Sequence, residues 1–232
     1  MMLDYYLWGI ILLPGLILSI YASIKVNSTF NTYNSIDSEK NIPANVLART
    51  ILDQAGLTNI TIRQIHGHLT DYYNHRKKII ALSTNVYDSS SIAAIGVALH
   101  EVGHAIQYKT NYLPIKIRNL IIPICNFANR FLWIFIILGA IFFYTNLGTI
   151  FLWVGVGIFG ISVLLNLITL PVELNASKRA LKLLKDAQIL NNEEIHGAKK
   201  VLDAAALTYV AGLVVSILNL LRLLIVVLDR KD

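Results

Sequence analysis

His100-Glu101-Val102-Gly103-His104 is the most informative stretch of this chain, because two histidines four residues apart with a glutamate between them form a zinc-site pattern. At about 3.6 residues per turn, His100 and His104 lie on the same face of a helix. Neutral imidazoles at this spacing can bind one Zn²⁺ at about 2.0 to 2.1 Å, and Glu101 can act as general base on a zinc-activated water. We predict one Zn²⁺ per chain, bound by His100 and His104, with Glu101 as the catalytic residue.

The residues before the motif support this prediction. Residues 91–99 are small and mostly apolar, and Ser89 or Ser90 is a suitable helix cap, so the motif is expected inside a buried helix. A buried polar group without a partner costs about 1 to 3 kcal/mol, and the motif holds three such groups. A metal site therefore explains the motif better than chance recurrence of its three fixed letters.

The composition predicts a membrane protein. Of 232 residues, 55% are hydrophobic and 15% are charged, with a mean hydropathy of +0.58. Tyr5 to Ile24 carries no charge over 20 residues, enough to span about 30 Å of hydrocarbon. Because Asp4 precedes it and no basic residue does, we expect a retained anchor rather than a cleaved signal peptide.

Further apolar blocks follow. Phe131 to Tyr144 and Thr149 to Leu170 flank a short link, residues 145–148, which predicts an antiparallel transmembrane hairpin. The first helix is expected either to extend back through Arg130 or to cross the bilayer at a thin spot, and Pro123 indicates a kinked or interfacial entry into it. The last block, 204–228, contains Asn219 and Arg222 and is expected either to span the bilayer or to lie along its interface.

The basic residues predict an orientation. Residues 25–130 hold 11 Lys and Arg and residues 171–203 hold 6, together 17 of 20, so both segments are expected in the cytoplasm. This topology accounts for the net charge of +6, and we expect no nucleic-acid partner. The single cysteine, Cys125, excludes an internal disulfide.

The cytoplasmic segment predicts a small α+β module. The Asn, Ser and Thr of residues 27–45 indicate a linker, and Pro43 can begin a helix that ends near Gly56. Strands are expected at 58–65 and 78–83, with a turn region at 69–76 between them. Residues 79–82 are either an exposed edge strand that holds an extended peptide or an ordinary sheet strand.

A catalytic zinc usually has three protein ligands and one open position, so a third ligand is needed. Glu173 follows the third apolar block on the same predicted side of the membrane, and Pro171 suits the start of a new helix there. From the residues alone, Glu173 is either the ligand or a solvated glutamate near a helix N-terminus. Ser177, one turn later, could orient a ligand.

At these residues the chain resembles a known family, the YugP-like membrane proteins described as neutral zinc metallopeptidases. The resemblance covers most of the chain and rests on five segments: residues 69–73, Leu82-Ser83 with Val86-Tyr87, residues 91–94, residues 100–107, and Pro171-Val172-Glu173 with Asn175-Ala176-Ser177. The layout also resembles HtpX-type membrane gluzincins, which implies Glu173 as the third zinc ligand. Those relatives carry an aspartate where this chain has Ser177.

The chain has further polar residues that could belong to the site. Tyr72, Tyr73 and Arg179 are candidates for stabilising an oxyanion. For the remaining histidines we expect loop, surface or helix-end positions rather than ligation: His66, His68, His75 and His196.

We therefore predict an α+β, mostly α, fold of several membrane helices with a small cytoplasmic zincin-like module. Its function would be that of an integral membrane zinc endopeptidase, in a bacterial-type cell membrane, acting on peptide or membrane-protein substrates near the cytoplasmic face. The alternative is a membrane scaffold or quality-control adaptor with a non-catalytic zinc site. A transporter is disfavoured because the apolar blocks hold no acidic residue. The expected segments are an anchor (1–26), the module (27–118), the hairpin (119–170), a cytoplasmic helix with the third ligand (171–203) and a C-terminal apolar helix (204–232).

Overall fold

The computed structural model describes residues 9–229, and these form two compact units. We name them the apolar helical unit (9–22, 113–171 and 208–229) and the mixed unit (23–112 and 172–207). The chain is mostly helical with one small sheet, as expected. The predicted N-terminal anchor and C-terminal helix each extend into residues outside the described range, 1–8 and 230–232.

The apolar helical unit contains helices that suit a bilayer. Among the described residues, three helices are long and apolar enough to cross a membrane: α6 (Leu113–Ile141), α7 (Asn146–Asp186) and α8 (Asn192–Asp229). Between 11% and 22% of the residues in their most apolar windows are buried. Large apolar side chains exposed along a whole helix are stable in lipid and costly in water.

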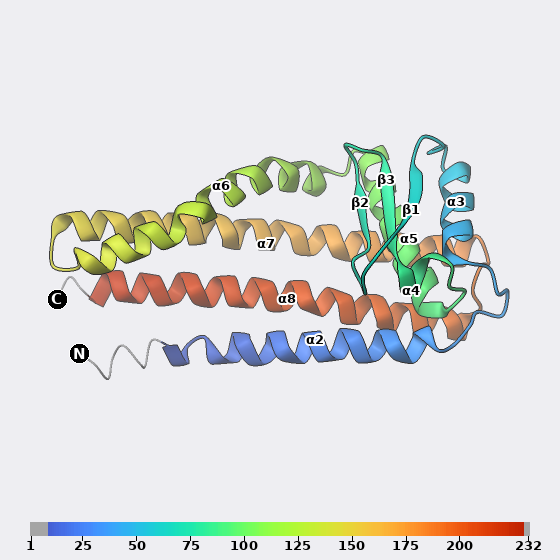
Figure 1. Cartoon of the computed structure of the whole chain (residues 1–232), viewed down its shortest axis with the longest axis horizontal. Helices are drawn as coiled ribbons and strands as arrows, with labels where there is room; N and C mark the ends of the chain where they lie inside the picture. The colour runs from blue at the N-terminus through green and yellow to red at the C-terminus, as the bar shows by residue number, and fades with distance from the viewer. Residues whose placement is uncertain (1–8, 230–232) are drawn as a thin grey trace. The chain divides into compact units, whose positions relative to one another are not determined.

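Helices α6 and α7 run antiparallel through a short turn, and α6 bends part-way along its length (Figure 1). Gly139 allows their close approach, because a Cβ there would lie 2.6 Å from a Leu152 methyl carbon. Pro123 lies inside α6, which extends back through Arg130 as predicted. Pro171 lies inside α7 and does not begin a new helix, so that prediction was wrong. A proline removes one helical hydrogen bond, and α7 continues past it to Asp186.

Helix α2 (Leu13–Asn34) continues into the segment predicted as a linker. Its polar side chains bond back to the helix, with Asn27 Nδ2 donating to Ser23 O at 2.8 Å and Thr32 Oγ1 donating to Ser28 O at 2.9 Å. Phe30 is fully buried in the core of the mixed unit. The prediction of a linker from residue 27 was therefore wrong up to Asn34, because packing stabilises a helix there despite its polar composition.

The mixed unit has a three-stranded sheet in the order β1 (Thr61–Ile65), β3 (Ile79–Ser83), β2 (Tyr72–Asn74). Strand β3 pairs parallel with β1 and antiparallel with β2. Both edges of β3 are therefore occupied. Of the two alternatives predicted for residues 79–82, the exposed peptide-binding edge is wrong and the ordinary sheet strand is confirmed. The predicted turn region at 69–76 contains β2, whose three residues are too short to show an alternating pattern.

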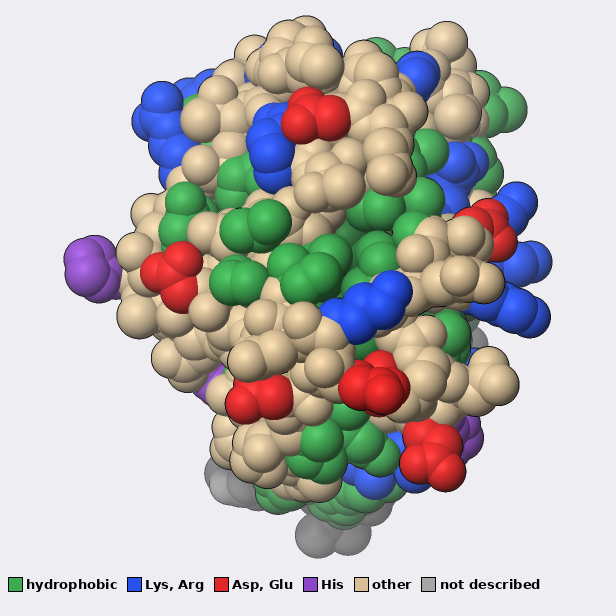
Figure 2. All heavy atoms as spheres, turned by 90° about the vertical axis from the view of Figure 1, so that its right-hand side faces the viewer, with side chains coloured by type: hydrophobic (Ala, Val, Ile, Leu, Met, Phe, Trp, Pro, Cys, Tyr) green, Lys and Arg blue, Asp and Glu red, His purple; other side chains and the backbone are tan. Residues whose placement is uncertain are grey.

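Helices cover the sheet and complete the core of this unit (Figure 1). Helix α3 (Ala44–Gln54) follows Pro43 and buries one face, and the short α4 (Thr84–Tyr87) leads into α5 (Ile92–Lys109). The cap of α5 is Ser91, whose Oγ accepts from Ala94 N at 3.1 Å, and not Ser89 or Ser90. Figure 2 shows the end of this unit near α3, where apolar side chains gather among charges of both signs.

Candidate metal centre

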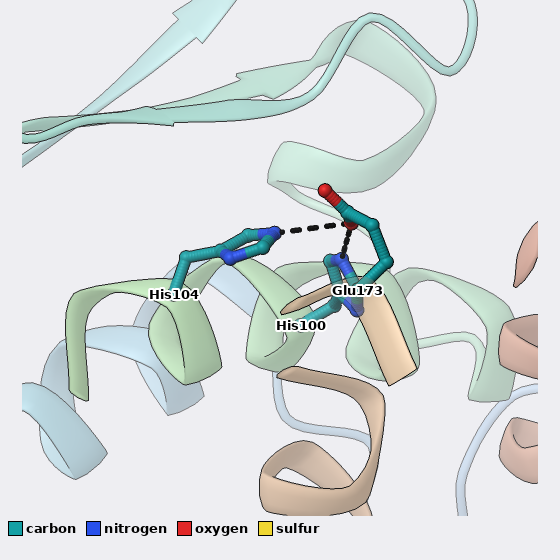
Figure 3. Close-up of side chains that lie close together, drawn as sticks. All are labelled: His100, His104 and Glu173. Carbon is teal, nitrogen blue, oxygen red and sulfur yellow. Dashed lines mark hydrogen bonds and ion pairs between the residues drawn. The ribbon is translucent and has the colours of Figure 1, made fainter. Parts of the chain in front are cut away.

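His100 and His104 project from one face of α5. Their rings meet edge to face, with centroids 4.7 Å apart and an interplanar angle of 88°. Both rings turn their Nε2 atoms toward the same point, as Figure 3 shows. The helical register expected from the sequence therefore produces a convergent pair of imidazoles.

Glu173 reaches this point from α7. Its Oε2 atom lies 3.2 Å from His100 Nε2 and 3.3 Å from His104 Nε2 (Figure 3). The three ligand atoms all lie within 4.8 Å of one another. In a tetrahedral zinc site with bonds of about 2.0 to 2.1 Å, neighbouring ligand atoms are roughly 3.3 to 3.4 Å apart. The two separations between the Glu173 oxygen and the imidazole nitrogens are close to this value, so the two imidazoles and the carboxylate could hold a zinc ion.

A close contact between α5 and α7 sets these distances. A Cβ on Gly103 would lie 2.6 Å from the Ala176 carbonyl oxygen, closer than real side chains come. Glycine at 103 and alanine at 176, which is fully buried, let the two helix backbones approach. Glu173 and the two histidines lie within one turn of this contact, so it brings the three ligand atoms together.

Each histidine has a partner on its other ring nitrogen. His100 Nδ1 lies 3.1 Å from Ser177 Oγ, and His104 Nδ1 lies 2.9 Å from Gln107 Oε1. Hydrogen bonds at Nδ1 orient an imidazole and leave Nε2 for a metal. The expectation that Ser177 contacts a ligand agrees with this geometry, whereas Gln107 was not identified from the sequence.

Glu101 is buried on α5 beside the two histidines, with 6% of its surface exposed. Burial raises the pKa of its carboxyl group; the charges of His104 and His100 oppose this, and those of Glu173 and Asp71 add to it. Burial also acts to lower the pKa of His104, but the hydrogen bond and charge of Glu173, together with Glu101, raise it overall. A carboxylate with a raised pKa is a better proton acceptor near neutral pH.

The candidate oxyanion residues are held by other contacts. Tyr73 packs edge to face on Tyr108, and burial raises the pKa of Tyr73, while Tyr72 is 48% exposed. Arg179 Nε donates to Asn175 Oδ1 at 2.8 Å, and its guanidinium lies over the ring of Tyr112 at 5.9 Å. None of these contacts is to His100, His104 or Glu173.

The other histidines lie outside the metal-binding group of the described residues. His66 and His196 are exposed. His68 contacts Asn85 Nδ2 at 3.0 Å, and His75 stacks on Tyr108 with centroids 4.4 Å apart.

The sequence predicted no role for two residues of this site, although both lie in the segment 100–107 that carries the resemblance. Gly103 was treated as a variable position of the motif, although a glycine in the middle of a buried helix is a signal of close backbone approach. Gln107 lies one turn after His104, and a buried amide so close to a histidine is expected to bond to it. Both could have been proposed from spacing, but their partners on α7 could not.

The chain is similar to known proteins over most of its length. Residues 8–228 match the family described as "Putative neutral zinc metallopeptidase". The chain belongs to this family. A relative from Bacillus subtilis (strain 168), "Putative membrane protease YugP", is 38% identical over 215 residues, which cover 93% of this chain and 94% of that protein. No solved structure matches the chain. The predicted family membership, and with it the class of zinc metallopeptidase, is confirmed.

Proposed function

We propose that this protein is an integral membrane zinc endopeptidase that hydrolyses peptide bonds of polypeptides near the membrane surface. The observation that carries the proposal is the convergence of His100, His104 and Glu173 at the spacing of a tetrahedral zinc site, with Glu101 buried beside them. Membership in a family of zinc metallopeptidases supports the same activity. Three protein ligands leave one position open, which is typical of catalytic rather than structural zinc.

The four residues have two different roles in the proposed reaction: three hold the metal and one transfers a proton. His100, His104 and Glu173 would hold one zinc ion, which when bound polarises the scissile carbonyl and lowers the pKa of water. Glu101 takes a proton from the attacking water as the water oxygen bonds to the carbonyl carbon. Glu101 then gives that proton to the amide nitrogen as the C–N bond breaks, which releases a carboxylate and an amine.

The membrane orientation is part of the proposal. The mixed unit carries most of the basic residues, and the positive-inside rule puts such segments in the cytoplasm. The site would then face the cytoplasm, where unfolded segments and membrane-protein tails are the accessible peptides. Of the segments predicted from sequence, we retain 27–118 and 171–203 as the cytoplasmic parts and 119–170 as the transmembrane hairpin. The N-terminal anchor (1–26) and a spanning C-terminal helix (204–232) complete this topology.

The function is tested by zinc content and cleavage of an unfolded substrate, measured in detergent on the full chain. Wild type should bind about one zinc and cleave. Glu101→Gln should keep the zinc and lose cleavage, because its amide cannot accept a proton, and Glu173→Ala should lose both. Zinc without cleavage in the wild type would favour the scaffold alternative, and the absence of zinc would contradict the site.

A further inference from the structure

Gln107 occupies a fully buried position between α5 and α7. Its Nε2 donates to the Val172 carbonyl oxygen at 2.7 Å and to Asn175 Oδ1 at 3.0 Å. Its Oε1 lies 2.9 Å from His104 Nδ1. The side chain has no exposed surface, so these partners satisfy it in place of water.

The partners fix which way the amide faces. A backbone carbonyl can only accept a hydrogen bond, so the NH₂ group of Gln107 must face Val172. Asn175 Oδ1 also faces Arg179 Nε, which can only donate, at 2.8 Å, so this atom is an oxygen that accepts from Gln107. Two independent groups therefore set the same orientation. The reversed amide would place oxygen against oxygen in a buried site, which costs about 1 to 3 kcal/mol for each unsatisfied group.

This orientation determines the proton position on His104. The Gln107 oxygen can only accept, so Nδ1 of His104 must carry a hydrogen. In the neutral ring the lone pair then lies on Nε2, the atom that faces Glu173 at 3.3 Å. His100 differs, because its Nδ1 faces the Ser177 hydroxyl, which can either donate or accept.

We propose that Gln107 is a positioning residue that keeps the proton of His104 on Nδ1, so that Nε2 is available to the metal. This inference rests on the proposed zinc site and adds to it a residue that does not touch the ion. The two histidines are then unequal ligands: His104 is held in its binding form before the metal arrives, and His100 is free to adapt through the Ser177 hydroxyl.

A purely structural role for Gln107 must be separated from this one. The amide also joins α5 to α7 through Val172 and Asn175, so any loss of Gln107 removes contacts between the helices. Asn175→Ala is a matched control, because it removes one of these contacts and leaves both the Val172 carbonyl and the His104 partner in place. Gln107→Glu retains an oxygen that accepts from Nδ1 and, as the protonated acid, a hydroxyl that donates to the Val172 carbonyl, whereas the nearly isosteric Gln107→Met offers neither.

The experiment measures zinc affinity of the full chain in detergent by competition with a chelator, with thermal unfolding of the metal-free protein as the folding control. We expect Gln107→Met to lower the affinity about 10-fold to 100-fold, the usual effect of losing a ligand's hydrogen-bond partner. Gln107→Glu and Asn175→Ala should stay within about threefold of wild type, since both keep an acceptor at Nδ1.

Equal losses in Gln107→Met and Gln107→Glu would overturn the inference, because they would mean that the amide only joins the helices. Unchanged affinity in Gln107→Met would overturn it as well. If Gln107→Met does not fold, Gln107→Glu decides: retained affinity supports the inference and a loss of tenfold or more contradicts it. A wild type that binds no zinc would instead contradict the proposed function.

Discussion

Gly103 of α5 lies so close to the Ala176 carbonyl of α7 that a Cβ on Gly103 would come within 2.6 Å of that oxygen. The contact lies between the two histidines in the sequence and one turn from Glu173. It explains how the candidate ligands from two helices come close together. Any side chain at position 103 must separate the helices where His100, His104 and Glu173 meet.

Gly103→Ala should therefore weaken zinc binding by tenfold or more and destabilise the protein by about 1 to 3 kcal/mol, the usual cost of overpacking. The obstacle is a backbone oxygen, which cannot rotate away as a flexible side chain could. Zinc competition and thermal unfolding measure the two effects.

Gly96→Ala is the control for this prediction, because it lies on the same helix and its added Cβ would meet Ala198 Cβ at an ordinary 3.5 Å. That variant should keep its zinc affinity. Its free energy of unfolding should increase by up to about 1 kcal/mol, since alanine favours a helix more than glycine does. Equal zinc affinity in the two variants would contradict the role given to Gly103.

A substitution at Ser177 is expected to raise the zinc affinity, whereas Gly103→Ala lowers it. The Ser177 hydroxyl lies 3.1 Å from His100 Nδ1. A carboxylate can only accept, so Ser177→Asp should fix the His100 proton on Nδ1 and raise zinc affinity, by up to about tenfold. Ser177→Ala should lower the affinity by less than Gln107→Met does. A chelator titration of these variants, with Ser177→Asn as the uncharged control, would show whether the ranking holds.

The parts of this site that the sequence predicted depend on local spacing. His100, Glu101 and His104 share one helix, so their register followed from the helical period alone. Glu173 needed the additional evidence of resemblance, because its approach to the histidines depends on the packing of two helices distant in sequence. The partners of Gly103 and Gln107 are tertiary contacts of the same kind, and one sequence contains no direct signal for them.

The elements of the fold that could be predicted from the sequence are likewise those with a local pattern, and the others depend on tertiary contacts. Long apolar blocks and the helix of the motif were predicted because their patterns extend over many residues. Strand β2 has three residues, and the polar end of α2 is stabilised by Phe30 packing into the core, so neither has a clear local pattern. The order of the sheet, with β3 in the centre, depends on pairing that strand composition does not specify.

Asp71 gives a prediction about pH. Its carboxylate accepts from Ser83 N at 2.7 Å and Ser83 Oγ at 3.0 Å, yet burial raises its pKa overall. A carboxyl group whose pKa is higher in the folded state favours folding when protonated. Its contribution is fully present below the unfolded pKa and is lost as pH rises through the folded pKa. The stability of wild type relative to Asp71→Asn should thus decrease as the pH rises above about 4.

Thermal unfolding of both proteins between about pH 4 and pH 7 measures this difference. Because the asparagine oxygen can still accept from Ser83 N, the comparison isolates the charge. A difference that stays constant would show that the hydrogen bonds with Ser83 balance burial, and one that increases with pH would show that they outweigh it; either would contradict the prediction.

Glu194 gives the last prediction, on a contact that holds the segment after α2. Its buried carboxylate accepts from Glu39 N at 2.6 Å and Asn191 N at 2.8 Å, which joins that segment to the start of α8. Glu194→Ala leaves both donors without this partner and should destabilise the protein by about 1 to 3 kcal/mol. The neighbouring Glu193 is exposed, so Glu193→Ala should change stability by less than about 0.5 kcal/mol. Unfolding free energies of the two variants test this contrast, and equal values would mean that water replaces the carboxylate at no cost.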